Sequence, residues 1–231
     1  MMKTLYIIRH GQTEWNVQAR MQGRLDSALT CMGQQQAGAH GAAIGALGGV
    51  DVLYVSPLGR TRETADILNS HLDAQMRFEE ALMERDCGAW SGLTVSEVAD
   101  RWPVEWRARS HDPFNHRPPE GENLGDMLTR VEAFLRMLQL SGESTVGLVT
   151  HGIMSRCVLT HYLGLSAEEA MGVKHPNGIF YRLQFVESEV RPSYFINGDG
   201  PRAGLLREDM GGTILRPIEK SPIGEPQGGM G

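Results

Sequence analysis

Two histidines stand directly beyond short apolar runs of the chain. Residues 5–8 lead into His10, residues 145–149 lead into His151, and each run predicts a buried strand. In an open α/β sheet, ligands bind beyond the carboxyl ends of the strands, so both imidazoles should project into one crevice. One such histidine is usually structural, but two in equivalent positions favour a functional site. Each is followed by a glycine, which lets the backbone turn tightly and approach a ligand closely: Gly11 and Gly152.

Two arginines accompany this pair of histidines. Arg9 precedes His10, and Arg60 lies shortly after residues 50–55, another apolar run that predicts a strand. Arginine presents a planar fork of N–H groups that can bind two oxygens of a phosphate at once. Arg60 alone would be interpreted as a surface residue of the helix that follows. Its place beyond a strand puts it at the same edge of the sheet, and the residue types together predict a phosphate site.

One acidic residue completes the set of groups that phosphate chemistry needs. Cleavage of a phosphate ester requires a proton for the leaving oxygen, and a carboxyl group can supply it. The candidate is Glu84, in the sequence Met-Glu-Arg-Asp-Cys-Gly-Ala-Trp of residues 83–90. Taken by itself this glutamate is indistinguishable from a surface acid, so its assignment depends on the residues around it.

Bulk composition and missing motifs exclude several other classes. The formal net charge is -6, so the chain as a whole is not built to hold nucleic acid or an anionic membrane surface. The sequence contains no nucleoside-triphosphate P-loop, no cysteine followed six positions later by arginine, and no His-Glu-x-x-His motif. No metal or other cofactor is therefore predicted. A metal held by His10 and His151 is the alternative to a phosphate site there.

Cysteine usage and the amino terminus favour a cytoplasmic location. The 3 cysteines are odd in number and lack metal-binding spacing, which is typical of reduced thiols. No apolar run approaches the ~18 residues that span a membrane, and charge interrupts the amino terminus too early for a signal peptide. We expect neither a nucleic-acid nor a membrane partner, and the sequence gives no oligomeric state.

Alternating strands and helices must position these residues. Further strands are predicted at residues 75–79, 179–186 and 194–196. Helical spacing and capping signals predict helices at residues 30–47, 58–72, 94–101, 123–140 and 152–163, and another that begins near residue 166. This alternation implies an α/β fold, a three-layer sandwich with a mainly parallel central sheet flanked by helices.

Composition divides the chain into a body and a tail. Residues 1–196 carry the predicted elements and form a single catalytic domain, whereas residues 197–231 are rich in glycine and proline and predict a tail that folds little alone. Leu205 and Leu206 could still dock on the body, and so could Thr213, Ile214 and Leu215. Within the domain, residues 102–121 predict an irregular loop or short helical excursion over the body. Their aromatic side chains are interpreted as packing, with a substrate-contacting lid as the alternative.

Taken in order, the motifs resemble those of the histidine phosphatase superfamily, the phosphoglycerate-mutase-like group with an Arg-His-Gly signature. The similarity begins with Leu-Tyr-Ile-Ile-Arg-His-Gly-Gln-Thr-Glu-Trp-Asn at residues 5–16. It continues through residues 21–30, 56–65, 84–92, 119–123 and 149–152. A single triplet is a weak signal, but the whole series, in the family's order between residues 4 and 186, is specific.

The resemblance implies a role for each residue of the site. His10 would accept the phosphoryl group on a ring nitrogen, and Glu84 would protonate the leaving group and then help activate water. Three further side chains would bind the phosphoryl oxygens: Arg9, Arg60 and His151. Asn16 would contact the phosphate, and backbone N–H groups at the helix start beyond Gly152 would add to the site. The substrate entrance would be lined by Gln22 and Gly23.

The implied activity is metal-independent hydrolysis of small-molecule phosphomonoesters through a phosphohistidine. The attacking nitrogen of His10 must be unprotonated, and the two arginines should lower its pKa. One alternative is a phosphoglycerate mutase, which passes the phosphoryl group to a hydroxyl instead of water. Residues 22–27 are more similar to the phosphatases, and residues 85–120 are shorter than the mutase insertion. The other alternative is a non-catalytic phosphate-binding module, which would be expected to lack His10 or Glu84.

Overall fold

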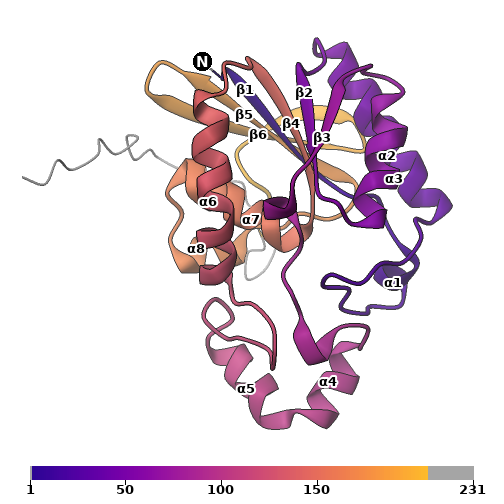
Figure 1. The fold of residues 1–231 in the computed structure, drawn as a ribbon, viewed down its shortest axis with the longest axis vertical. Helices are drawn as coiled ribbons and strands as arrows, with labels where there is room; N and C mark the ends of the chain where they lie inside the picture. Colours follow the sequence, from indigo (N-terminus) through magenta and orange to yellow (C-terminus); the bar gives the residue numbers. More distant parts are fainter. Residues whose placement is uncertain (1, 208–231) are drawn as a thin grey trace, which may run out of the picture.

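One mixed sheet of seven strands runs through the molecule, in the order β3-β2-β4-β1-β5-β6-β7 (Figure 1). This computed structural model describes residues 2–207. The strands β1 to β4 pair in parallel, whereas β5 pairs antiparallel with β1 and the remaining two strands continue antiparallel. The strands are β1 Thr4–Arg9, β2 Val52–Val55, β3 Gln75–Phe78, β4 Thr145–Thr150, β5 Ile179–Val186, β6 Glu189–Ile196 and β7 Asp199–Ala203.

Helices cover both faces of this sheet, which confirms the predicted three-layer arrangement (Figure 1). One face is covered by α2 (Cys31–Ala46) and α3 (Gly59–Asn69), and the other by α6 (Leu124–Leu140), α7 (Gly152–Leu163) and α8 (Ala167–Gly172). The shorter elements are α1 (Glu14–Val17), η1 (Glu80–Leu82), η2 (Gly88–Trp90), α4 (Val95–Arg101) and α5 (Pro103–His111).

The apolar run of β1 is continuous because both of its faces are buried. Leu5 and Ile7 pack into the cluster beneath α6 and α7, whereas Tyr6 and Ile8 pack into the cluster beneath α2 and α3. All four side chains are at most 2% exposed. The strand that leads into His10 is therefore held from both sides, which fixes the position of the residues beyond its end.

The helix ends follow the capping residues of the sequence. α6 begins after Asn123, which forms a capping box with Asp126, and α2 begins after Thr30, whose side chain accepts from the backbone N–H of Gly33. α7 ends at Gly164, which has a φ of 62° that glycine adopts without strain. Among residues 2–207, no helix has the length and apolar character needed to cross a lipid bilayer.

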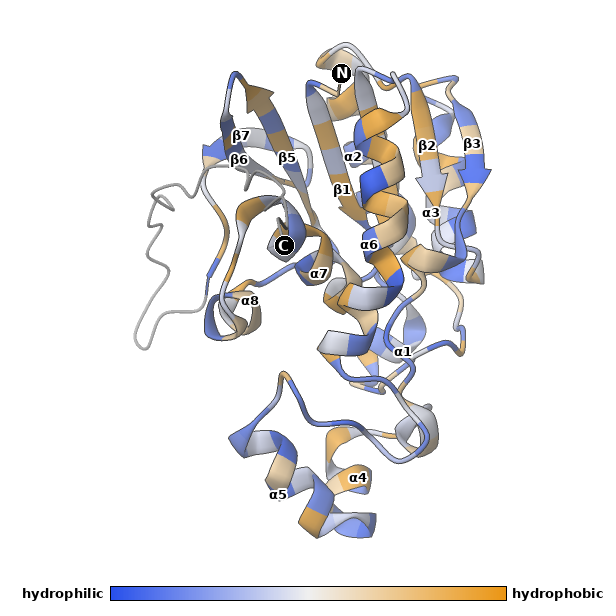
Figure 2. Cartoon of the chain, turned by 60° about the vertical axis from the view of Figure 1, so that its left-hand side comes forward, coloured by the Kyte–Doolittle hydropathy of each residue, from blue (hydrophilic) through white to orange (hydrophobic). Residues whose placement is uncertain are grey.

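A small cap lies beyond the carboxyl ends of the parallel strands and contains α4 and α5 (Figures 1 and 2). It has its own cluster of buried residues around Trp90, with Trp102 and Trp106 packed against it. The predicted excursion at residues 102–121 is thus partly helical, because Pro103 stands in the first turn of α5, where its missing N–H costs nothing. The tryptophans serve packing here, as the sequence interpretation favoured.

The carboxyl-terminal boundary drawn from composition is wrong at its start. Residues 199–203, assigned to a tail, form β7 and pair with β6, and Leu205 is 1% exposed in the core. The sequence does not predict this strand because its glycine and proline have little strand propensity. Pairing with β6 stabilises it. The predicted docking of Leu205 and Leu206 is confirmed. The remainder of the predicted tail, residues 208–231, lies outside the described residues.

Candidate active site

The pairing of β1 with β4 brings the two histidines together. These strands are parallel neighbours with Arg9 opposite Thr150, so the next residue of each strand, His10 and His151, leaves the sheet at the same level. Their ring centroids are 5.3 Å apart and the ring planes are inclined by 58°. Both side chains are buried, with at most 3% exposure. The prediction that equivalent strand ends bring the two histidines together is therefore confirmed.

The His10 ring is held with one defined nitrogen available for chemistry. Its Nδ1 lies 2.8 Å from the carbonyl oxygen of Gly11. A carbonyl only accepts, so Nδ1 carries the proton and the lone pair lies on Nε2. Burial, followed by the charges of Arg9 and Arg60, holds the pKa of His10 well below its ordinary value. The sequence predicted the effect of the arginines, but burial is the larger cause.

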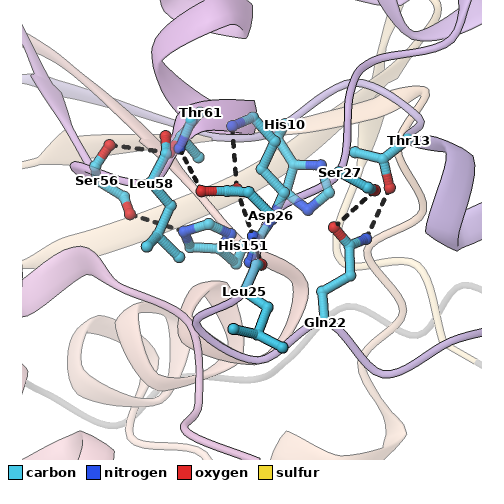
Figure 3. Close-up of polar contacts among 12 residues, drawn as sticks. His10, Thr13, Gln22, Leu25, Asp26, Ser27, Ser56, Leu58, Thr61 and His151 are labelled. Carbon is cyan, nitrogen blue, oxygen red and sulfur yellow. Dashed lines mark hydrogen bonds and ion pairs between the residues drawn. The ribbon is translucent and has the colours of Figure 1, made fainter. Parts of the chain in front are cut away.

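His151 is fixed by a serine that the sequence analysis did not single out. Its Nε2 lies 2.7 Å from Ser56 Oγ, and both residues are completely buried (Figure 3). Nδ1 of His151 is buried and has no hydrogen-bond partner in the described part of the chain. Burial, then Arg60 and His10, hold the pKa of His151 well below its ordinary value, so the ring is neutral. The ring therefore has one unused nitrogen near His10.

The guanidinium of Arg9 lies between the backbone carbonyl of His175 and the backbone of Gly152. Its Nη1 donates to the carbonyl oxygen of His175 at 2.5 Å, and its Nε has no partner among residues 2–207. A Cβ added at Gly152 would lie 3.3 Å from Cζ of Arg9, so the guanidinium rests directly on the backbone there. Burial lowers the pKa of Arg9 to about 10, against the opposing charge of Glu84. Arg9 stays cationic at neutral pH.

Arg60 is only 2% exposed, and its guanidinium is fixed by several hydrogen bonds. Its Nη1 donates to the carbonyl oxygen of Leu25 at 2.6 Å and to Asp26 Oδ1 at 2.8 Å. Its Nη2 donates to the carbonyl oxygen of Gly23 at 2.8 Å, and its Nε is without a partner in the described residues. The edge formed by Nε and Nη2 therefore retains N–H groups for an oxyanion.

Asp26 links this arginine to the start of α3. Its carboxylate accepts from the backbone N–H of Gly59 at 2.7 Å and from that of Arg60 at 3.2 Å, in addition to the Arg60 side chain. α3 has no side-chain cap of its own at Leu58, so Asp26 serves as the cap from a distant loop. No local spacing in the sequence signals this role.

Glu84 is anchored at the first turn of α7. Its Oε1 accepts from the backbone N–H groups of Arg85 at 2.8 Å and Met154 at 3.2 Å, and its Oε2 accepts from that of Ile153 at 3.1 Å. The positive end of a helix stabilises a carboxylate in this position. Oε2 accepts only this one N–H and keeps a further lone pair. Glu84 also lies close enough to Arg9 for its charge to raise the pKa of that arginine against the effect of burial.

The loop between β1 and α2 supplies the remaining predicted residues. Asn16 Oδ1 accepts from Thr13 in a capping box, and Gln22 Nε2 donates to Thr13 Oγ1 at 2.7 Å. Both amides are thus engaged within the loop, although both residues line the cavity beside His10. Gly23 has a φ of 55°, and a Cβ there would lie 3.0 Å from the backbone nitrogen of Cys87. Only glycine allows this close approach of the two loops.

Two adjoining cavities open at these residues. The smaller, of about 170 Å³, is lined by Arg9, His10, Asn16, Arg20, Met21, Gln22, Gly23, Arg60, Glu84, Arg85, Cys87 and Ile153. The larger, of about 480 Å³, is lined by Arg9, Glu84, Gly152, Ile153, Arg156, Lys174, His175 and Pro176. Arg9, Glu84 and Ile153 belong to both. His151 lies behind these walls and is not among the lining residues.

Two supporting residues come from the segment before β5 and were missed by the sequence analysis. The side-chain amide of Asn177 donates to the carbonyl oxygen of His10 at 2.9 Å. The ring of His175 bonds Ser155 Oγ at 2.7 Å and the carbonyl oxygen of Ile179 at 2.9 Å, which fixes the backbone carbonyl that receives Arg9. Between residues 2 and 207, no group of three or more His, Cys, Asp or Glu side chains is placed to hold a metal ion.

The fold and the paired histidines define an α/β protein of the phosphoglycerate-mutase-like type. The chain belongs to the histidine phosphatase superfamily, branch 1, whose family model matches residues 5–196. This superfamily contains phosphatases and mutases.

Known proteins resemble this chain in sequence or in structure. The probable phosphoglycerate mutase GpmB of Citrobacter koseri is 34% identical over 191 residues, which are 81% of this chain and 87% of that protein. The structure is similar to that of a mycobacterial glucosyl-3-phosphoglycerate phosphatase, with 27% identity, a TM-score of 0.74, and coverage of 83% of this chain and 97% of that one. Bacillus stearothermophilus YhfR is 29% identical with a TM-score of 0.74, over 85% and 97% of the two chains.

Proposed function

We propose that the protein is a metal-independent phosphomonoesterase that works through a phosphohistidine at His10. The observation that carries this proposal is the state of the His10 ring. Gly11 occupies Nδ1, burial and two arginines lower the ring's pKa, and the lone pair of Nε2 is left for attack. Nε2 is thus a neutral nucleophile beside two fixed cations, which is the arrangement that phosphoryl transfer requires.

The first step forms a bond from Nε2 of His10 to phosphorus and breaks the bond between phosphorus and the ester oxygen. Arg9 and Arg60 retain unused N–H groups that can bind the phosphoryl oxygens as their charge is redistributed. In the substrate complex Oε2 of Glu84 carries a proton on the lone pair that no backbone N–H occupies, and it gives this proton to the leaving alcohol oxygen. His151 does not line either cavity, but its Nδ1 is unpaired within residues 2–207, and in this proposal it adds a third donor from behind the two arginines.

The second step returns the enzyme to its starting state. A water molecule attacks phosphorus and gives one proton to Glu84, the bond from phosphorus to Nε2 breaks, and inorganic phosphate leaves. The lone pair returns to Nε2, and Glu84 is again the acid form that the next turnover needs. No bound metal enters either step.

The test is turnover of p-nitrophenyl phosphate with and without a chelator. Wild-type protein should release nitrophenol at a rate that the chelator leaves unchanged, and His10→Ala should reduce that rate by at least about 10³-fold. His71→Ala, which removes an exposed histidine, is the matched control. Label from a ³²P-ester should appear on wild-type protein in an acid-labile, base-stable form and be absent from His10→Ala. Lack of turnover across a panel of phosphomonoesters would contradict the proposal and favour a phosphate-binding module.

A mutase is the second candidate, because the Citrobacter relative is named as a probable phosphoglycerate mutase. The same phosphohistidine would then pass its phosphoryl group to a hydroxyl of a bound phosphorylated acid. Interconversion of 2- and 3-phosphoglycerate, followed by phosphorus NMR, separates the two activities. We expect release of inorganic phosphate to exceed interconversion, and the reverse result would assign the chain to the mutases.

A further inference from the structure

Residues 119–123, Pro-Glu-Gly-Glu-Asn, form one of the motifs by which the chain resembles its family, yet they line neither cavity of the site. They lie instead against the turn that follows Glu84. The backbone N–H of Glu122 donates to the carbonyl oxygen of Asp86 at 2.9 Å. A Cβ at Gly121 would lie 2.6 Å from that same oxygen, so only glycine allows the two segments to approach so closely.

The side chains of Glu122 and Arg130 hold this turn on both sides of Glu84. On one side, Oε2 of Glu122 accepts from the backbone N–H of Asp86 at 2.9 Å. On the other side, Nη2 of Arg130 donates to the carbonyl oxygen of Met83 at 3.2 Å. The two side chains also bind each other, with Nε 3.0 Å from Oε1 and Nη2 3.1 Å from Oε2. A bidentate pair of this kind has a defined geometry, so it fixes the backbone that carries the proton donor.

The same carboxylate reaches the loop that holds Arg60. Oε1 of Glu122 accepts from Nη2 of Arg24 at 3.1 Å. Arg24 stands between Gly23 and Leu25 in the chain. The carbonyl oxygens of these two neighbours receive the guanidinium of Arg60, at 2.8 Å and 2.6 Å. A movement of Arg24 would therefore move both carbonyl groups that orient this guanidinium.

We propose that Glu122 is a positioning residue that holds the proton donor Glu84 and the phosphate-binding Arg60 in a fixed arrangement. Arg130 transmits its effect to Glu84, and Arg24 transmits it to Arg60. The side chains of Glu122 and Arg130 are at most 20% exposed, so water weakens their ion pair less than it would weaken a surface pair. This inference rests on the proposed function for the roles of Glu84 and Arg60, and it concerns their placement relative to each other.

A displaced proton donor has a kinetic signature that a loss of packing does not share. Nitrophenolate is a stable anion and departs with little help from an acid, whereas phenolate is more basic and depends more on the proton of Glu84. The value of kcat/KM reports the steps up to departure of the alcohol. Displacement of Glu84 should therefore lower kcat/KM more for phenyl phosphate than for p-nitrophenyl phosphate. Displacement of Arg60 should instead weaken inhibition by inorganic phosphate, whatever the leaving group.

The two connections of Glu122 can be broken one at a time. Arg130→Met should lower kcat/KM at least about fivefold more for phenyl phosphate than for p-nitrophenyl phosphate, with phosphate inhibition changed less than about twofold. Arg24→Met should raise the inhibition constant of phosphate about threefold to tenfold and keep the ratio of the two kcat/KM values within about twofold of wild type. Glu122→Ala should show both effects. Glu122→Gln, whose amide oxygen can still accept the N–H of Asp86, should keep more of the wild-type ratio.

Arg136→Met is the matched control, because it removes an exposed arginine of α6 that pairs with Glu132. It should keep both the ratio and the phosphate inhibition of wild-type protein. Circular dichroism shows which variants fold, and if Glu122→Ala does not, Glu122→Gln and the two arginine variants carry the same comparison.

Equal losses for the two esters in Arg130→Met, together with unchanged phosphate inhibition in Arg24→Met, would overturn the proposal and leave Glu122 a packing role. If wild-type protein hydrolyses neither ester, the proposed function fails separately. Calorimetric titration with inorganic phosphate then decides the connection to Arg60. A severalfold weaker affinity in Arg24→Met supports it, and an affinity equal to that of wild-type protein overturns it.

Discussion

Ser56 Oγ and His151 Nε2 are 2.7 Å apart across two neighbouring strands, and neither residue is exposed. Ser56 directly follows β2, and His151 directly follows β4, which pairs with β2. Among residues 2–207, Nε2 of His151 is the one hydrogen-bond partner of this hydroxyl, so the hydroxyl hydrogen has no other acceptor there, and we infer that it is donated to Nε2. The neutral imidazole then carries its own hydrogen on Nδ1, which is the nitrogen left without a partner in the described structure. A serine two strands away from the nucleophile thus sets the tautomer of the second histidine.

Ser56→Ala should therefore lower activity without removing any group from the cavity. Loss of the hydroxyl lets the His151 ring place its hydrogen on either nitrogen, and we expect kcat/KM for p-nitrophenyl phosphate to fall about tenfold, equivalent to about 1.4 kcal/mol. Steady-state kinetics measure the loss. Ser70→Ala, at the exposed end of α3, is the control and should retain wild-type kinetics. An unchanged kcat/KM in Ser56→Ala would show that the tautomer is set elsewhere.

Asp26→Asn separates the charge of Asp26 from its capping role. The amide oxygen can still accept the N–H of Gly59, so stability should change by less than about 1 kcal/mol, the usual worth of a helix cap. Arg60 loses its carboxylate partner, and we expect the KM for p-nitrophenyl phosphate to rise severalfold. Asp26→Ala removes both contacts and should lower the free energy of unfolding by about 1 kcal/mol. Asp66→Asn, on the exposed face of α3, is the matched control for denaturant unfolding and kinetics.

Gly152→Ala should displace the guanidinium of Arg9. The new Cβ would lie 3.3–3.4 Å from three atoms of that group, so the side chain must move by a few tenths of an ångström. We expect a severalfold rise in the inhibition constant of inorganic phosphate, because the unused N–H of Arg9 is re-aimed. Gly38→Ala, in α2, meets only one atom, at 3.9 Å, and should leave phosphate binding unchanged while stabilising the helix by about 0.5–1 kcal/mol. Equal inhibition constants in both variants would remove Arg9 from the phosphate site.

Four buried histidines should make the fold sensitive to acid. Burial is the first cause in each case: the pKa of His40 is lowered to about 4 and that of His175 to about 3, and those of His10 and His151 are lowered well below the ordinary value. The unfolded chain therefore binds protons first, below about pH 6.5. Stability is complete above that pH and declines as the pH falls, by about 1.4 kcal/mol per pH unit for each such histidine.

Denaturant unfolding between pH 7.5 and 5.0 measures this slope. His40→Leu removes a titrating ring that lies against Phe180, away from the site, and should make the slope shallower by the contribution of one histidine. His71→Ala, which removes an exposed histidine, should leave the slope unchanged. A free energy of unfolding that does not depend on pH below 6.5 would mean that these rings are protonated as easily in the folded state as in the unfolded chain.

The sequence predicts the strands and the residues at their ends because both depend on local patterns. Continuous apolar runs mark β1 and β4, and the position of His10 and His151 follows from where those runs stop. Asp26, Ser56 and Asn177 escape such reasoning because their partners lie 34, 95 and 167 positions away in the chain. Their roles arise only when the loops are brought together over the sheet.

The tail boundary fails for a related reason. β7 contains a glycine and a proline among its five residues, and local propensity gives no hint of a strand. Pairing with β6 stabilises it, so this strand depends on a neighbouring strand rather than on its own residues. The helix that begins at Pro103 does have a local signal, because proline is common in the first turn of a helix. The sequence analysis missed this signal because residues 102–121 as a whole have the composition of a loop.

The cap around Trp90 stands on a hydrophobic cluster separate from the two clusters that hold the sheet. The groups assigned to bond breaking come from the strand ends and from the turns beside them, whereas α4 and α5 belong to the cap. Changes within α4 and α5 can therefore accumulate without disturbing the packing beneath His10. The cap and the sheet are therefore two separately packed units, and the cap can be altered as a unit while the strand ends that carry His10 and His151 keep their support.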